Sequence, residues 1–132
     1  MKVLFLVQAE QRAILDRLYE GVQAHCECDL RWLSREDQAD LKGYFKREVD
    51  VPRYDRIVFF LRFKQEVRQV GFIASLPNLV ILEHDAYQNY ISCKYTGKFS
   101  RHYRQLPSAR VISSGYMVVQ RLLAEGVDAC FV

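Results

Sequence analysis

Short apolar runs without polar and apolar alternation recur along the chain, and they constrain the fold more than any other feature of the sequence. A strand with one solvated face alternates, whereas a continuous apolar run is typical of a strand buried on both faces in a parallel sheet. The runs predict strands at Val3–Val7, Leu30–Leu33 with Cys28 as an earlier start, Arg56–Leu61, Leu79–Leu82, Arg110–Ile112 and Val127–Val132.

Stretches with helical spacing separate these runs. Ser34, with Asp37 three residues later, has the form of a capping box and predicts a helix that reaches about Phe45. Gly126 is a common stop signal and predicts the end of another helix. The remaining helices are predicted over Gln11–Val22, Lys64–Ser75, near Lys98–Gln105 and over Tyr116–Ala124.

Strands that alternate with helices predict an α/β fold. We expect one domain over residues 1–132, with a Rossmann-like, doubly wound, mainly parallel six-stranded sheet and helices on both faces. The chain stops at Val132 on a predicted strand with no helix after it. This ending predicts a piece of a longer protein, and a natural C-terminal edge strand is the alternative.

The composition is that of a soluble globular protein, with 50% hydrophobic and 27% charged residues. The net charge of +3 counts against a dedicated nucleic-acid binder but suits phosphate-bearing ligands or an anionic membrane surface. No apolar run approaches the roughly 18 residues of a membrane span, and the N-terminal run of about six residues is too short for a signal peptide. We therefore expect a cytoplasmic protein and leave open a peripheral contact with the inner face of the membrane.

The cysteines do not predict a metal site. Cys26 and Cys28 are two residues apart, and no second Cys or His pair has zinc spacing. We expect reduced structural thiols.

The end of the fourth predicted strand is the strongest candidate for a site, because ligands of open α/β sheets bind at the carboxyl ends of the strands. There Leu79–Leu82 is followed by Glu83, His84 and Asp85. Histidine titrates near neutrality and a neighbouring carboxylate can orient it. We assign His84 and Asp85 to catalysis, with a capping role as the alternative for Asp85, and interpret Glu83 as structural.

Gln8 and Glu10 follow the first strand, where they either face a ligand or cap the next helix. This position lacks the Gly-x-Gly-x-x-Gly pattern of dinucleotide binding, and the chain has no Walker-A loop. Arg62 and Lys64 follow the third strand and suit a phosphate or a sugar hydroxyl, or else are solvated charges. An aspartate, which a receiver domain requires there, is missing.

Ser113, Ser114 and Gly115 follow the fifth strand. Small residues allow a ligand to approach closely, and a helix N-terminus attracts anions, although a simple helix cap explains the same residues. Between Tyr87 and Arg104, aromatic and cationic residues are interleaved. This mixture suits single-stranded nucleic acid, sugar rings or lipid headgroups, or an amphipathic helix whose aromatic residues pack inward.

Three segments together resemble the N-terminal half of a GT-B glycosyltransferase of the retaining group called family 4. They are Lys2–Val7, the strand end Leu82-Glu83-His84-Asp85, and the run from Val111 to Gly115 with Leu122 to Val127. The resemblance implies a two-domain enzyme whose C-terminal domain, missing here, holds most of the nucleotide-sugar donor. The N-terminal domain would supply the acceptor site, for a glycan or a lipid-linked acceptor.

The resemblance also implies roles for the candidate residues. His84 would reach the donor sugar with Asp85 as its support, Arg62 and Lys64 would lie on the acceptor side, and Tyr87 would face the acceptor. No bound metal or other cofactor is implied. Gln8-Ala9-Glu10 stands where many members have glycines near the donor phosphates. The alternative functions are a non-catalytic Rossmann-like module that binds a nucleotide or a protein, and an RNA-binding domain.

Overall fold

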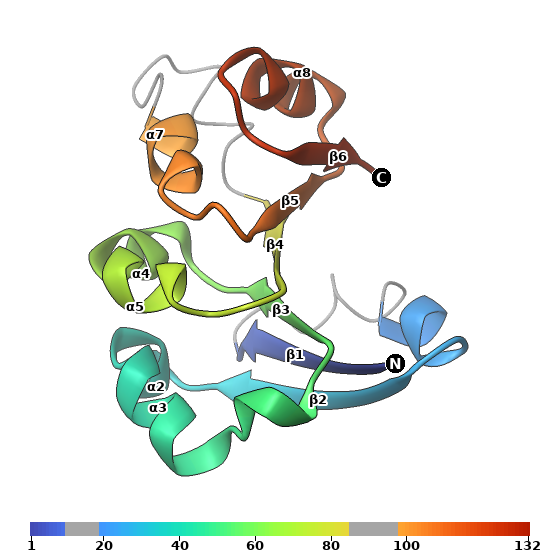
Figure 1. Ribbon diagram of the computed structural model, residues 1–132, viewed down its shortest axis with the longest axis vertical. Helices are drawn as coiled ribbons and strands as arrows, with labels where there is room; N and C mark the ends of the chain where they lie inside the picture. The colour runs from blue at the N-terminus through green and yellow to red at the C-terminus, as the bar shows by residue number, and fades with distance from the viewer. Residues whose placement is uncertain (10–18, 85–97) are drawn as a thin grey trace.

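The computed structural model describes residues 1–9, 19–84 and 98–132, and its centre is one six-stranded sheet (Figure 1). Every strand pair is parallel, in the order β2-β1-β3-β4-β5-β6. The predicted α/β fold with a parallel six-stranded sheet is therefore confirmed. The strands are β1 (Lys2–Gln8), β2 (Glu27–Leu33), β3 (Arg56–Phe60), β4 (Leu79–Glu83), β5 (Arg110–Ser113) and β6 (Ala129–Phe131).

The direction of winding reverses at β1. The chain passes from β1 to β2 on one side, crosses back to β3 on the other side, and then adds β4, β5 and β6 outward. Leu4 of β1 accordingly lies between Asp29 of β2 and Ile57 of β3. In open α/β sheets the crevice at such a reversal, outside the carboxyl ends of the strands, is where ligands bind.

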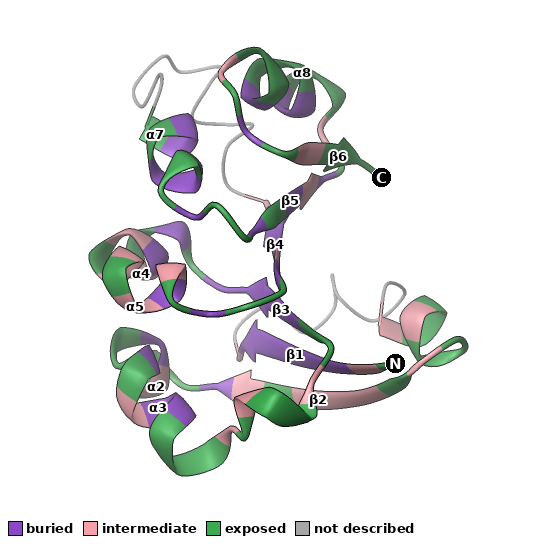
Figure 2. Cartoon of the chain, in the orientation of Figure 1, coloured by how far each residue is buried: buried purple, intermediate pink, exposed green. Residues whose placement is uncertain are grey.

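Both faces of the sheet are apolar, because successive side chains of a strand point to opposite faces and both sets are hydrophobic here. On one face Leu4, Leu6 and Phe59 belong to the main core, with side chains from the helices that follow β2, β3, β4 and β5. On the other face Phe5 and Val7 pack with residues of the helical turn 19–23. Most residues of the central strands β1, β3 and β4 are buried, and helical residues lie on both faces as predicted (Figure 2).

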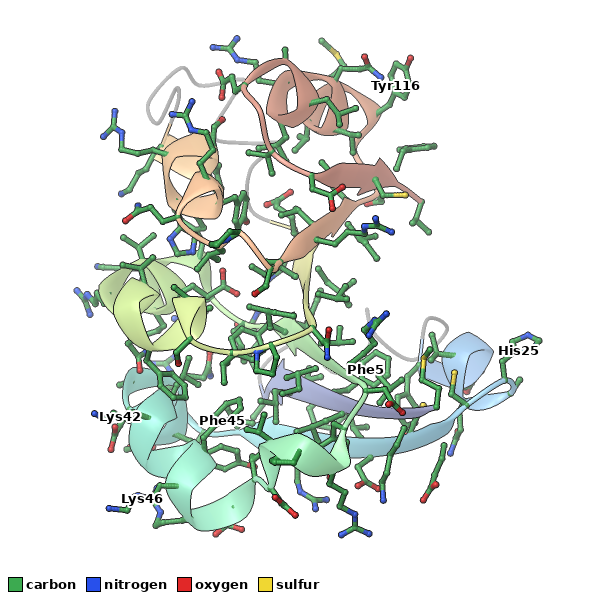
Figure 3. All side chains as sticks on the ribbon, viewed as in Figure 1. Phe5, His25, Lys42, Phe45, Lys46 and Tyr116 are labelled. Carbon is green, nitrogen blue, oxygen red and sulfur yellow. The ribbon has the colours of Figure 1, made fainter. Side chains whose placement is uncertain are left out.

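The helices present one apolar side to the sheet. In the second helix after β2, Phe45 points toward the sheet while Lys42 and Lys46 point outward (Figure 3). None of the described helices has the length and hydrophobicity needed to cross a bilayer. The helices that lie wholly within the described residues are α2 (Arg35–Ala39), α3 (Leu41–Glu48), the 3-10 helix η1 (Val51–Arg53), α4 (Phe63–Arg68), α5 (Val70–Ala74), α7 (Lys98–Arg104) and α8 (Tyr116–Ala124).

Two helices predicted to be continuous are each broken in the middle. Ser34 caps α2 as predicted, with its hydroxyl accepting the Asp37 N–H at 3.1 Å. Asp40 then leaves the helical conformation, and its carboxylate accepts the Gly43 N–H at 3.1 Å, which starts α3 as a new helix. A short acidic side chain that bonds the backbone locally competes with helix continuation in this way.

The second break lies at Gln69, between α4 and α5. Its side-chain oxygen accepts the Leu41 N–H at 2.7 Å, and its side-chain nitrogen donates to the Gln38 carbonyl at 2.6 Å. Gln69 thus satisfies backbone groups at the end of α2 and the start of α3, which would otherwise lack helical partners. The Gln69 side chain, which lies at the second break, therefore hydrogen-bonds the backbone on both sides of the first break.

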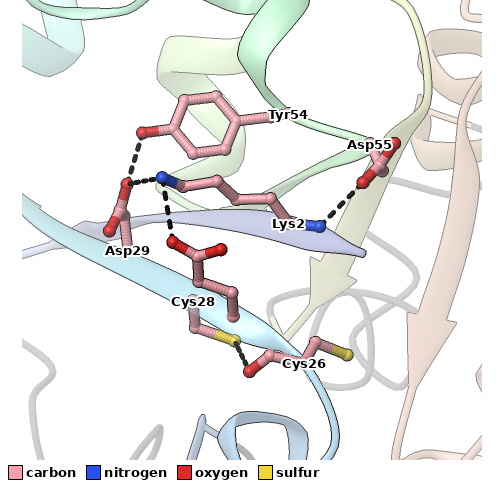
Figure 4. Close-up of polar contacts among 7 residues, drawn as sticks. Lys2, Cys26, Cys28, Asp29, Tyr54 and Asp55 are labelled. Carbon is pink, nitrogen blue, oxygen red and sulfur yellow. Dashed lines mark hydrogen bonds and ion pairs between the residues drawn. The ribbon is translucent and has the colours of Figure 1, made fainter.

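A network of charged residues ties β1, β2 and β3 together at the amino end of the sheet (Figure 4). The Lys2 ammonium lies 3.3 Å from a Glu27 oxygen and 3.7 Å from an Asp29 oxygen. The Tyr54 hydroxyl donates to the same Asp29 oxygen at 2.6 Å, and the Lys2 main-chain N–H donates to Asp55 at 2.7 Å. These contacts fix the amino end and leave the carboxyl end for a site.

The network predicts an acid-dependent loss of stability. The hydrogen bond from Tyr54, followed by the charges of Lys2 and nearby arginines, lowers the pKa of Asp29. A lowered carboxyl pKa contributes stability above the unfolded value, near pH 4, and this contribution disappears as the pH falls through the folded pKa. We expect Asp29→Asn to lower the melting temperature by a few degrees at pH 7, and the difference from the wild type to shrink below pH 4.

Thermal melts from pH 2 to pH 7 test this expectation. Asp50→Asn is the matched control, because the Asp50 side chain makes no capping hydrogen bond to η1. A melting difference that is the same at every pH would contradict the role assigned to Asp29.

Candidate functional site

His84 lies where the carboxyl ends of β1, β3 and β4 meet. Its Nε2 atom is 3.1 Å from the Leu61 carbonyl oxygen and 3.3 Å from the Gln8 side-chain nitrogen. The ring packs on Phe60, with the ring centroids 4.4 Å apart and the planes 32° apart. His84 is therefore joined to β1 and β3, the two strands between which the winding reverses.

The contact with Leu61 favours one tautomer of His84. A carbonyl oxygen can only accept, so this contact is a hydrogen bond when Nε2 carries the proton. The oxygen and nitrogen of the Gln8 amide can be assigned in either of two orientations. In the flipped orientation the amide oxygen faces the same N–H and accepts from it.

The Gln8 side chain contacts the His84 ring. Gln8 is the last residue of β1, and only 1% of its surface is exposed. A buried amide needs hydrogen-bond partners, and the His84 ring supplies one. Gln8 contacts the histidine ring from the end of β1, and its role in ligand binding stays a prediction.

A cavity of about 280 Å³ opens beside His84, at the carboxyl ends of β4 and β5. Its lining consists of Glu83, His84, Ser113, Ser114 and Gly115. Ser113 accepts the Gly115 N–H at 3.1 Å and donates to a Glu83 oxygen at 3.4 Å. Ser114 is exposed, and Gly115 is the N-cap residue of α8. The structure thus brings Ser114 and Gly115 to the same cavity as His84.

The remaining candidates are spread more widely. Arg62 is the exposed N-cap residue of α4, and Lys64 is exposed in the first turn of the same helix, both on the carboxyl side of β3. Glu10, Asp85 and Tyr87 lie outside the described residues. Within residues 1–9, 19–84 and 98–132, no group of three His, Cys, Asp or Glu side chains is arranged to hold a metal ion.

The aromatic residues of α7 pack inward. Phe99 and Tyr103 are buried, whereas Lys98, Arg101 and Arg104 are exposed. Phe63 of α4 contacts the Phe99 ring at 4.0 Å between centroids. For this part of the interleaved region the amphipathic-helix interpretation is confirmed, and Phe99 and Tyr103 do not present a stacking surface for bases.

The sequence analysis missed a buried pair beneath this edge, Glu66 of α4 and His102 of α7. Only 2% and 3% of their side chains are exposed, and the nearest oxygen and nitrogen are 3.9 Å apart, too far for a hydrogen bond. Burial lowers the pKa of His102 to about 4. His102 is therefore neutral at pH 7, and the pair is not an ion pair. His102 follows Phe99 by three residues, a spacing that places both residues on one face of a helix. This spacing was the sequence signal that His102 is buried.

A second hollow, with a volume of about 480 Å³, lies at the amino ends of the strands. Val3, Val58 and Val80 line it, together with Arg110 and Asp128, whose side chains pair with each other at 3.3 Å. No histidine is among its described lining residues, in contrast to the carboxyl edge. We therefore place the candidate site at the carboxyl edge, despite the smaller cavity there.

Comparisons with known proteins do not identify the chain: no protein-family model, curated protein or solved structure matches it. The geometry of the carboxyl edge is therefore the basis on which we infer a function.

His102 predicts a second pH dependence. The unfolded chain takes up a proton at this histidine near pH 6.5 and the folded chain near pH 4. Stability that is fully present above pH 6.5 should therefore fall as the pH drops toward 4, by on the order of 3 kcal/mol. His102→Phe removes this titration and suits the neighbouring rings of Phe63 and Tyr103.

Denaturant unfolding at pH 7 and at pH 5 measures this effect. We expect a smaller loss of stability between the two pH values for His102→Phe than for the wild type. His25→Gln, in the exposed turn before β2, should keep the wild-type dependence. If His102→Phe keeps the full dependence, the titrating group lies elsewhere.

Proposed function

We propose that this chain is the acceptor-side domain of a GT-B glycosyltransferase, which transfers a sugar from a nucleotide-sugar donor in glycan biosynthesis. The observation that carries the proposal is the position of His84 at the reversal of winding, where contacts with Leu61 and Gln8 fix its ring. A histidine so fixed meets the first requirement of an acid–base or positioning group, which is geometry.

The size of the cavity supports a site with a second wall. At about 280 Å³ it lies below the roughly 300–1000 Å³ of pockets that enclose a whole small ligand. It is large enough for part of a sugar, while a nucleotide-sugar needs more surface. In a two-domain enzyme the other domain supplies that surface when the cleft closes.

The side chains around the cavity suit this role. His84 lines the cavity, where its ring can contact a sugar hydroxyl, and Gln8 keeps the ring in place. Arg62 and Lys64 on the carboxyl side of β3 suit the acceptor or its phosphate. Lys98 and Arg101, exposed on α7, suit a lipid-linked acceptor at an anionic membrane surface.

A non-catalytic binding module is the competing function, and one specific observation favours it. Tyr116, Met117 and Phe131 are large exposed hydrophobic residues, and the rings of Tyr116 and Phe131 are in contact with centroids 5.6 Å apart. Tyr116 follows Gly115 directly, and Phe131 pairs with Ser113, so they adjoin the cavity. Exposed apolar surface of this kind marks interfaces, with a partner protein or with the second domain of the enzyme.

Nucleoside diphosphate release distinguishes the two functions. The complete polypeptide that contains residues 1–132 is incubated with a panel of nucleotide-sugars and candidate glycan acceptors. Glycosyl transfer predicts release with at least one donor, and His84→Ala should reduce it by about 10²–10⁴-fold, the usual contribution of an acid–base group. The binding module predicts ligand or protein binding without release.

His25→Ala is the matched control, because this histidine is exposed at the amino end of the sheet, away from the site. Unchanged near-UV circular dichroism establishes that His84→Ala is folded. Full activity in the folded variant would exclude the role of His84.

A further inference from the structure

Glu83 occupies a special position in the candidate site, although the sequence favoured a structural role for it. It ends β4, and only 7% of its surface is exposed. It lines the open cavity with His84 and Gly115, and it also lines a narrow gap beneath, next to Glu66. Glu83 therefore forms the inner wall of the cavity, and a buried carboxylate there is costly unless hydrogen-bond donors face it.

Two hydrogen bonds lead in sequence from Gly115 through Ser113 to Glu83. The Gly115 N–H donates to the Ser113 hydroxyl oxygen, so the hydroxyl proton is directed to the Glu83 carboxylate, which accepts it. The parallel register places Glu83 and Ser113 side by side on β4 and β5, which makes this contact possible. Glu83, held in this way, forms part of the wall of the cavity.

The same arrangement opposes an anion at the start of α8. A helix N-terminus carries partial positive charge, which attracts anions. Here the Gly115 N–H is bonded to Ser113, and Glu83 already places negative charge beside the first turn. A phosphate entering this cavity would meet a like charge in a site poorly screened by water.

We propose that the cavity between β4 and β5 binds the hydroxyl groups of a neutral sugar and rejects phosphate, with Glu83 as the specificity-determining residue. The inference rests on the proposed function and names the ligand class of that site. Glu83 and His84 both line the cavity, so the hydroxyl groups of a sugar bound there can reach their side chains. The phosphates of a nucleotide-sugar are consequently bound away from Ser113–Gly115.

Ligand titration of the complete polypeptide tests the inference. Isotope-labelled glycine reports the amide signal of Gly115 by NMR. The probes are glucose, galactose, mannose and N-acetylglucosamine, the 1-phosphate of each sugar, and inorganic phosphate. In the wild type we expect at least one neutral sugar to shift Gly115 with an affinity at least about tenfold higher than any phosphate-bearing probe.

Glu83→Gln keeps the shape of the side chain and removes its charge. We expect this variant to bind the neutral sugar roughly tenfold more weakly and phosphate more tightly, so that the preference is lost or reversed. Glu48→Gln, exposed on α3, is the matched control and should behave as the wild type. Should Glu83→Gln fail to fold, Ser113→Ala retains the carboxylate and should still reject phosphate while binding the sugar more weakly.

Three results would overturn the inference: a wild-type preference for phosphate, an unchanged preference in folded Glu83→Gln, or no shift of Gly115 with any probe. These results are separable from a failure of the proposed function. Neutral-sugar selectivity without nucleoside diphosphate release supports the ligand class and rejects transfer. Release of nucleoside diphosphate together with an unchanged preference in Glu83→Gln rejects Glu83 alone.

Discussion

Burial of both faces of the central strands is the constraint on which the rest of this structure depends. Leu4 and Leu6 lie under the helices of one face, and Phe5 and Val7 are buried on the other. When both faces of a strand are buried, polar side chains are largely confined to the ends of the strand. The amino ends are joined by the ionic network around Lys2, so the carboxyl ends collect the side chains available for a ligand.

Two supported groups stand at that edge, and neither is an isolated surface residue. The His84 ring is fixed by Leu61 and Gln8, and the Glu83 carboxylate accepts from Ser113, which itself accepts from Gly115. In both cases a neighbouring parallel strand supplies the support. Such preorganisation lowers the cost of ordering a site when a ligand binds. It is also why we interpret the edge as a sugar-binding wall instead of a set of solvated charges.

Much of the fold was predictable because it depends on local patterns. The apolar runs located five strands to within two residues at each end, while Leu30–Leu33 starts three residues after the start of β2 and its alternative start at Cys28 lies one residue after it. The spacing with Gly126 gave the bounds of α8. The broken helices were not predictable in this way. Asp40 bonds the backbone locally, and Gln69 reaches groups near α2 and α3 that are about 30 residues away in the chain. A pattern of hydrophobic residues contains no information about such a distant hydrogen bond.

The sequence by itself determined that polar residues follow buried parallel strands, and so it identified His84, Ser114 and Gly115 as candidates at one edge. Only the tertiary structure decided what each side chain does there, because strand order and register select the neighbours. Pairing of β4 with β5 places Ser113 beside Glu83, and the reversal of winding at β1 brings Gln8 to His84. These partners are 30 and 76 residues apart, and their contacts depend on long-range strand pairing that local periodicity does not encode.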